Sequence, residues 1–289
     1  MTAARTILRS RLVDRPIVTA PGVHDALSAR IAERAGFDAI YLGGNALGLS
    51  LGKGQPFVTL TDTAEATARI TAAVDLPLIV DIGCGFGEAA HVRGAVRAVE
   101  AAGAAAIHLD DQPYPKRAAY HRGEGTLASI AETTGKLAVA AAARRNPATL
   151  LIARTDALRV TKSLDEVIAR GRAFAKAGAE ALLVLDLDAQ RARAIRAALP
   201  DLPLVWIGGV SHPIPSRADL ADAGVALALY PFNTVAAVTD SVGALMATLK
   251  ADGVIDQSDD LLRAMRAETL ALVDMQTAWA IEAATRDPS

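Results

Sequence analysis

The stretch LIVDIGCGFGEAAHVRGAVRAVEAAGAAAIHLD, residues 78–110, decides the fold. It begins with a short apolar run that ends in Asp81, continues as an alanine-rich segment with helical spacing, and passes through Gly103 into a second apolar run. A glycine at this point permits the left-handed C-cap that ends a helix and releases the chain into the next strand. The stretch therefore predicts a strand, a helix and a second strand parallel to the first.

The same alternation of strand and helix recurs along the chain, and Gly36, Gly178 and Gly224 follow helical segments in the same way. Eight strands are predicted, at residues 17–20, 39–42, 78–81, 105–109, 150–154, 181–185, 204–207 and 226–230. Helices are predicted at residues 24–35, 63–73, 89–102, 126–145, 164–177, 189–198, 217–223 and 235–250. Eight short and continuously apolar strands favour an α/β fold of the (β/α)8 TIM-barrel type over an open sheet.

The length of 289 residues suits one barrel domain over residues 1–289, because such barrels need roughly 250 residues and often carry additions. Residues 258–286 predict an additional C-terminal helix. Its apolar side consists of Leu261, Leu262, Met265, Leu270, Leu272 and Val273. This helix either packs across the outside of the barrel or reaches a neighbouring subunit of a homo-oligomer. Spacing alone does not choose between the two arrangements.

Charge and cysteine content exclude several classes of protein. The 30 Lys and Arg residues nearly balance the 32 Asp and Glu residues, and no basic run interrupts the mixture. An electrostatic argument for binding nucleic acid or an anionic membrane is therefore absent. The single cysteine, Cys84, excludes an intrachain disulfide framework and a zinc site of several thiolates. With no signal-peptide core at the start and no apolar stretch near the roughly 18 residues of a membrane span, we expect a cytoplasmic protein.

Polar residues at the carboxyl ends of the predicted strands have the greatest functional weight, because barrel active sites form there. Asp81 and Asp110 end adjacent strands. Two carboxylates at one mouth suit Mg²⁺, which needs only one or two protein carboxylates beside water and substrate oxygens. The alternative is a structural role, in which each aspartate caps a helix or pairs with Arg154.

Anion-binding groups follow two other strands. The guanidinium of Arg154 can grip a substrate carboxylate or phosphonate, although Asp156 or Asp81 could instead hold it as a structural partner. The run Gly43-Gly44-Asn45 can present backbone N–H groups to an anion, although a tight turn would need the same glycines. His108 and His121 are the histidines near the inferred mouth.

Several of these segments together resemble a known superfamily. They are AIYLGG at 39–44, IVD at 79–81 with GFG at 85–87, IHLDDQ at 107–112 with Lys116-Arg117, ARTDA at 153–157 and LYP at 229–231. From about residue 17 to 249 the chain is similar to the isocitrate lyase and phosphoenolpyruvate mutase superfamily. That resemblance implies a barrel whose C-terminal helix is exchanged between subunits. It also implies cleavage or formation of C–C or P–C bonds beside a carboxylate, through a Mg²⁺-stabilised enolate.

By this resemblance Tyr41, Gly43 and Gly44 hold the carboxylate, Asp81 and Asp110 serve the metal, and Arg154 binds substrate. The chain departs from the superfamily at four acidic positions. Gly83 replaces a second aspartate, Asp110 replaces a glutamate, Leu185 stands in place of another glutamate with Asp186 next to it, and a loop aspartate is absent near Gln55. Whether the metal site is intact is left open by these changes.

The gating loop also departs from the superfamily. Its lyases carry a catalytic cysteine there, whereas this chain has KRAAYH at residues 116–121. Isocitrate cleavage by the usual mechanism is therefore disfavoured. Lys116, Tyr120 or His121 would supply the proton instead, and Cys84 is predicted to be a buried, inert thiol rather than a replacement acid.

These observations predict a C–C bond lyase or decarboxylase that acts on a small 2-oxo or 2-hydroxy dicarboxylate through an enolate. The predicted catalytic residues are Lys116, Arg154 and Tyr41. The predicted substrate-binding residues are Gly43, Gly44, Asn45, His108 and Arg154, and the predicted Mg²⁺ ligands are Asp81 and Asp110. Two alternatives are a barrel that binds a carboxylate without metal or turnover, and a phosphonate P–C bond mutase or hydrolase. The mutase alternative is weakened because the Asp-Lys and Asn-Ser pairs of such enzymes are missing.

Overall fold

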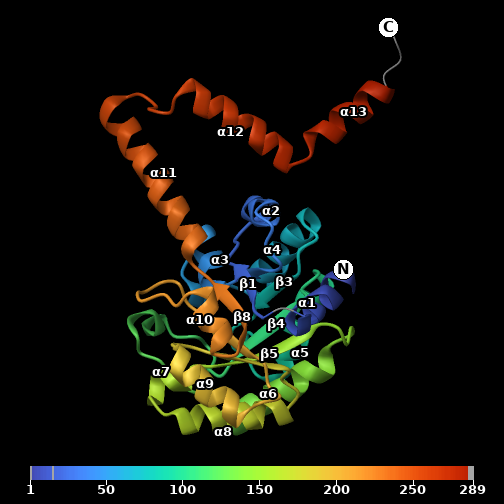
Figure 1. Ribbon diagram of the computed structural model, residues 1–289, viewed down its shortest axis with the longest axis vertical. Coiled ribbons are helices and arrows are strands. Elements are labelled where there is room, and N and C mark those ends of the chain that lie inside the picture. The colour runs from blue at the N-terminus through green and yellow to red at the C-terminus, as the bar shows by residue number, and fades with distance from the viewer. Residues whose placement is uncertain (1, 15, 286–289) are drawn as a thin grey trace.

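A computed structural model describes residues 2–14 and 16–285, and Figure 1 shows the course of the chain. Its strands are β1 (Val18–Pro21), β2 (Ile40–Leu42), β3 (Leu78–Asp81), β4 (Ala106–Asp110), β5 (Leu150–Thr155), β6 (Ala181–Val184), β7 (Leu204–Ile207) and β8 (Val225–Tyr230). The helices up to the middle of the chain are α1 (Thr2–Asp14), α2 (Ala26–Arg34), α3 (Gly44–Ser50), α4 (Leu60–Ala73), α5 (Ala89–Ala101), α6 (Ile130–Ala143) and α7 (Ala157–Thr161). They are followed by α8 (Leu164–Lys176), α9 (Ala189–Ala198), α10 (Arg217–Asp222), α11 (Asn233–Asp252), α12 (Asp259–Leu272) and α13 (Met275–Thr285), and 3₁₀ turns lie at Gln55–Phe57 and Ala118–Arg122.

The eight strands form one parallel sheet in the order β1-β8-β7-β6-β5-β4-β3-β2. A parallel bridge between Gly22 and Tyr41 joins its two edges, where the Val23 N–H donates to the Tyr41 carbonyl at 2.8 Å. The sheet therefore closes, and the predicted (β/α)8 barrel is confirmed. The register also positions the chemistry, because Asp81 lies opposite His108 and Asp110 lies opposite Arg154.

Two apolar layers explain why the strands are hydrophobic along their whole length. One face of each strand points into the barrel, where Val18, Ile79, Ile152, Leu183 and Leu227 are fully buried. The other face packs against the surrounding helices, whose alanines permit a close approach. Burial of both faces gives the continuous apolar runs that parallel strands typically show.

Helix α1 was not predicted, and it closes the amino-terminal end of the barrel. Leu8 is completely buried and joins the inner apolar layer. The Arg5 guanidinium is also buried and donates to the carbonyls of Glu100 at 2.6 Å and Ala104 at 3.0 Å. The polar sequence of this helix does not predict that it packs on the barrel. Its arginine side chains nevertheless bind backbone carbonyls at the end of the barrel.

The C-terminal arm, residues 233–285, leads away from the barrel (Figure 1). The predicted additional C-terminal helix is confirmed, and the structure divides it into α12 and α13. Asp274 between them has a φ of 55°, a left-handed conformation that ends the first helix. Arg286 lies outside the described residues. Among the described residues, no helix combines the length and the apolar character that a bilayer crossing requires.

Candidate active site

A cleft of about 790 Å³ opens at the carboxyl ends of the strands. Six of the predicted site residues line it: Tyr41, Gly43, Gly44, Asn45, Asp81 and Arg154. The lining also includes the apolar residues Leu185, Trp206, Ile207 and Phe232. His108 and Asp110 do not line the cleft, and Lys116 lines a smaller adjoining cavity that also contacts Gly44 and Asp81.

His108 is completely buried behind the cleft wall. Its Nε2 atom lies 2.8 Å from the Tyr41 hydroxyl, and the two rings stack with centroids 5.6 Å apart. The predicted contact between His108 and a substrate stays a prediction, since this buried side chain does not line the cleft. The imidazole of His108 lies behind Tyr41, and Tyr41 is the residue that lines the cleft.

Asp81, His108 and Asp110 form a compact group, with one potential ligand atom from each lying within 4.8 Å of the others. The buried atoms Asp110 Oδ1 and His108 Nδ1 are 3.3 Å apart, yet neither makes a hydrogen bond to any described residue. Asp81 accepts hydrogen bonds from the N–H groups of Gly44 at 3.1 Å and Gly83 at 2.7 Å. Two buried carboxylates, one with an unsatisfied oxygen, fit the small number of protein ligands that Mg²⁺ takes.

Lys116 and Asp110 form a buried ion pair, with Nζ 3.0 Å from Oδ2. Burial alone would raise the pKa of Asp110, but the charges of Arg154 and Lys116 hold it well below its usual range. Burial opposes the charge on Lys116, but the charge of Asp110 raises the lysine pKa above its usual value. The pair is therefore ionised at neutral pH, so Lys116 carries its proton.

Arg154 lines the cleft and is held there by two side chains. Its Nε donates to Asp156 Oδ1 at 2.9 Å, and one Nη atom lies 2.5 Å from the Tyr120 hydroxyl. The structural partnership with Asp156 is thus present, and the arginine still lines the cleft. A fixed and desolvated guanidinium suits anion binding, because no reorganisation is needed when the ligand arrives.

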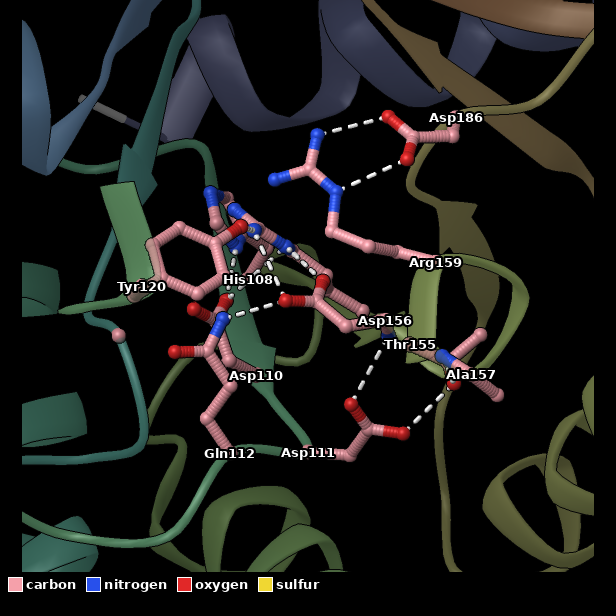
Figure 2. A network of polar contacts seen from close by, with 12 residues as sticks. His108, Asp110, Asp111, Gln112, Tyr120, Thr155, Asp156, Ala157, Arg159 and Asp186 are labelled. Atoms are coloured by element: carbon pink, nitrogen blue, oxygen red, sulfur yellow. Dashed lines mark hydrogen bonds and ion pairs between the residues drawn. The ribbon is translucent and has the colours of Figure 1, made fainter. Parts of the chain in front are cut away.

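A second row of polar residues, which was not predicted, contacts Asp156, the partner of Arg154 (Figure 2). Asp111 accepts hydrogen bonds from the Thr155 hydroxyl at 2.6 Å, the Asp156 N–H at 2.9 Å and Arg170 at 3.1 Å. The Gln112 amide donates to Asp156 at 2.5 Å. The consecutive aspartates 110 and 111 are the sequence feature that could have predicted this row. Adjacent residues at a strand end point in opposite directions, so one faces the site and the other faces away from it.

Asp111 gives the protein a specific pH dependence of stability. Burial raises its pKa from 3.8 to about 6 despite its three hydrogen bonds. Because the folded state binds this proton more tightly, the stabilising contribution is complete below about pH 4 and is lost as pH rises through about 6. Between about pH 4 and 7 the wild type is expected to lose about 2 kcal/mol of unfolding free energy relative to Asp111→Asn. Urea unfolding over this range measures the difference, and parallel curves for the two proteins would contradict it.

Three further side chains bear on the missing loop cysteine. Cys84 is 3% exposed, and burial raises its pKa to about 11, in keeping with an inert thiol. Burial also raises the pKa of Tyr120, so this hydroxyl remains protonated beside Arg154. The side chain of His121 lies outside the described part of the structure.

The altered acidic positions have their own local geometry. Gly83 has a φ of 52° and turns its N–H toward Asp81, while Gln55 lines the cleft near Gly44. Leu185 lines the cleft in place of a carboxylate, and the adjacent Asp186 pairs with Arg159. Arg159 was not predicted as a site residue, although it lies five residues beyond Arg154, in helix α7 directly after strand β5.

Comparison with known proteins places this geometry in a family. The family model described as phosphoenolpyruvate phosphomutase matches residues 8–250. The chain is 36% identical over 264 residues to 2,3-dimethylmalate lyase of Eubacterium barkeri, covering 88% of this chain and 90% of that protein. It is 36% identical over 243 residues to oxaloacetate decarboxylase of Bradyrhizobium sp. strain BTAi1, covering 83% of each chain.

The fold comparison agrees with the sequence comparison. A crystal structure of phosphonopyruvate hydrolase in complex with oxalate and Mg²⁺ superposes with a TM-score of 0.87 at 31% identity, covering 97% of this chain and 98% of that chain. The predicted class of carbon–carbon lyase is confirmed by the named lyase and decarboxylase relatives, beside which phosphonate enzymes also occur. The chain belongs to the phosphoenolpyruvate phosphomutase family, within the isocitrate lyase and phosphoenolpyruvate mutase superfamily.

Proposed function

We propose that this protein cleaves a C–C bond of a small 2-oxo or 2-hydroxy dicarboxylate. The observation that carries the proposal is the convergence of Arg154, the Gly43–Asn45 backbone and Asp81 on one cleft. A Cβ at position 44 would crowd this side of the cleft, since it would lie 3.0 Å from Gln55 Nε2 and 3.3 Å from Asp81 Oδ2. The glycine therefore lets a substrate carboxylate approach the backbone beside a fixed carboxylate and a fixed guanidinium.

The chain's own residues divide the work of such a reaction. Arg154 and the Gly43–Asn45 backbone hold the carboxylate next to the reacting carbon, and Tyr41, positioned by His108, donates a hydrogen bond to the oxygen that becomes negative. Burial, reinforced by Asp81, raises the Tyr41 pKa well above its usual value, so this hydroxyl stays a donor. Lys116 is the proposed proton donor to the carbon released by cleavage.

Asp81 and Asp110 would hold Mg²⁺, which supplies Lewis-acid stabilisation for negative charge beside the bound carboxylate. The relatives support this assignment because the phosphonopyruvate hydrolase structure is described as a complex with Mg²⁺. A cytoplasmic location stays a prediction.

Turnover of a substrate panel tests the function. Oxaloacetate, 2-methylmalate, 2,3-dimethylmalate and phosphonopyruvate would each be incubated with the protein and Mg²⁺, and pyruvate release would be measured by a coupled assay. We expect turnover of at least one dicarboxylate. Turnover of phosphonopyruvate alone would favour the phosphonate hydrolase alternative. Thermal stabilisation by a dicarboxylate that is never consumed would favour the binding-protein alternative.

We also propose that the C-terminal arm packs on a neighbouring copy of the chain in a homo-oligomer. Large apolar side chains are exposed along all three of its helices, including Met246, Leu261, Met265, Trp279 and Ile281. Only Val235 and Leu272 of its large apolar residues are buried among the described residues. So much exposed apolar surface on one extended segment is typical of an interface.

Truncation after residue 254 is expected to convert the oligomer to monomers, because it removes α12 and α13 and their apolar surface. Size-exclusion chromatography with light scattering measures the mass of each form. The double variant Leu261→Asp/Met265→Asp provides a version of full length with the same expected effect. A wild type that is monomeric at micromolar concentration would contradict the proposal.

A further inference from the structure

Arg159, in the short helix α7, is a second guanidinium at the cleft (Figure 2). Its Nε and Nη2 atoms donate to the two carboxylate oxygens of Asp186 at 2.8 and 2.7 Å. Its remaining nitrogen, Nη1, makes no hydrogen bond to any described residue. Figure 2 shows that this nitrogen points away from Asp186, toward the side on which Tyr120 lies. A donor of this kind is available to a bound anion.

Tyr120 connects Arg154 and Arg159. Its hydroxyl contacts Arg154 at 2.5 Å, and the guanidinium carbon of Arg159 lies 5.7 Å from the centre of its ring. The two cations therefore flank one side chain, so a short molecule with two acid groups can reach both. The positive charges of the two arginines are neutralised to different extents. Arg154 lies against two fully buried carboxylates, those of Asp110 and Asp156.

Arg159 has a weaker counter-charge. Its ion-pair partner Asp186 is 44% exposed, whereas the Arg159 side chain is 28% exposed and lines the cleft. Water weakens the attraction to an exposed carboxylate, so positive potential remains for a ligand. Asp186 has a φ of 58°, which non-glycine residues rarely adopt, and both of its carboxylate oxygens accept from the guanidinium.

We infer that Arg159 binds the second carboxylate of the substrate and that Asp186 is the positioning residue that orients it. The inference rests on the proposed function and deepens it, since the enzyme would then select dicarboxylates over monocarboxylates. Arg154 and the Gly43–Asn45 backbone hold the first carboxylate. Arg159 then discriminates substrates by the length and charge of the rest of the molecule. This assigns a specificity role to a residue outside the predicted site.

Binding of a matched, non-cleavable pair of acids tests the inference. 2-Methylsuccinate and 2-methylbutanoate differ in the second carboxylate, and both lack the 2-oxo or 2-hydroxy group of the proposed substrates. By calorimetric titration the wild type is expected to bind the dicarboxylate roughly 10- to 100-fold more tightly, as a charge-assisted hydrogen bond implies. Arg159→Gln is expected to remove this preference without changing monocarboxylate affinity. Arg159→Lys is expected to restore part of it, and Asp186→Asn to reduce it.

Arg191 provides the control, because it pairs with Asp188 at 2.7 Å on the rim of the same cleft but is 48% exposed. Arg191→Gln is expected to bind both acids as the wild type does. An Arg159→Gln protein that keeps the preference, a wild type without one, or loss of the preference in Arg191→Gln instead would overturn the inference. If the wild type turns over no dicarboxylate but Arg159→Gln still abolishes the binding preference, the proposed function fails and the inference stands.

Discussion

Replacing Arg154 with glutamine is expected to lower kcat/KM for the cleaved dicarboxylate by about 100- to 1000-fold. The change removes a fixed cation from a desolvated site, where one oriented donor is worth that much. It also leaves Asp110 and Asp156 with less compensation, and both carboxylates are completely buried. We therefore expect the unfolding free energy to fall by about 3–5 kcal/mol, the usual cost of breaking a buried ion pair. Steady-state kinetics and urea unfolding measure the two effects.

Two variants separate binding from stability in this experiment. Arg154→Lys keeps the charge but loses the fork of donors that reaches Asp156 and Tyr120, so it should recover more stability than activity. Arg69→Gln removes an exposed arginine paired with Glu65 and should change neither quantity measurably. A folded Arg154→Gln protein with wild-type kcat/KM would remove Arg154 from the site and the proposed carboxylate contact with it.

The barrel was predictable because its signal is periodic and local. The strand at residues 78–81 and the helix at residues 189–198 were predicted at their observed bounds, since apolar runs and alanine-rich segments alternate without interruption. Helix α1 was not predicted because it is stabilised by tertiary contacts rather than by a local pattern. One leucine packs in the barrel, and arginines donate to carbonyls that are distant in the sequence. The left-handed turn at Asp274 escaped because aspartate carries a weaker turn signal than glycine there.

The position of the site could be predicted from the topology, whereas the contacts between its side chains could not. Residues at the ends of neighbouring parallel strands must converge, so Asp81, Asp110 and Arg154 were predictable as a group. Which side chain meets which depends on register and on rotamers. The sequence could not distinguish His108 in the cleft from His108 behind Tyr41, nor show that the exposed Asp186 orients Arg159.

Removal of Mg²⁺ is expected to abolish turnover, and Asp81→Asn is expected to raise the Mg²⁺ concentration needed for half-maximal activity by roughly 10- to 100-fold. Both expectations follow from the buried carboxylates of Asp81 and Asp110 and from the unsatisfied oxygen of Asp110. Activity would be measured in EDTA and across a Mg²⁺ titration. Thermal stabilisation by Mg²⁺ alone gives a second signal that does not depend on turnover.

Asp62→Asn is the matched control for Asp81→Asn, because Asp62 is also ionised but pairs with Lys53 outside the cleft. Its Mg²⁺ dependence should equal that of the wild type. Full turnover in EDTA would exclude a metal requirement and would change how the replacement of an acidic residue by Gly83 is interpreted. The backbone N–H of Gly83 donates to Asp81 at 2.7 Å, at the position where the superfamily resemblance implies a second aspartate. In that case the charge beside the carboxylate would be stabilised by Arg154, Lys116 and backbone donors alone, and the loss of acidic residues would mark a change of mechanism.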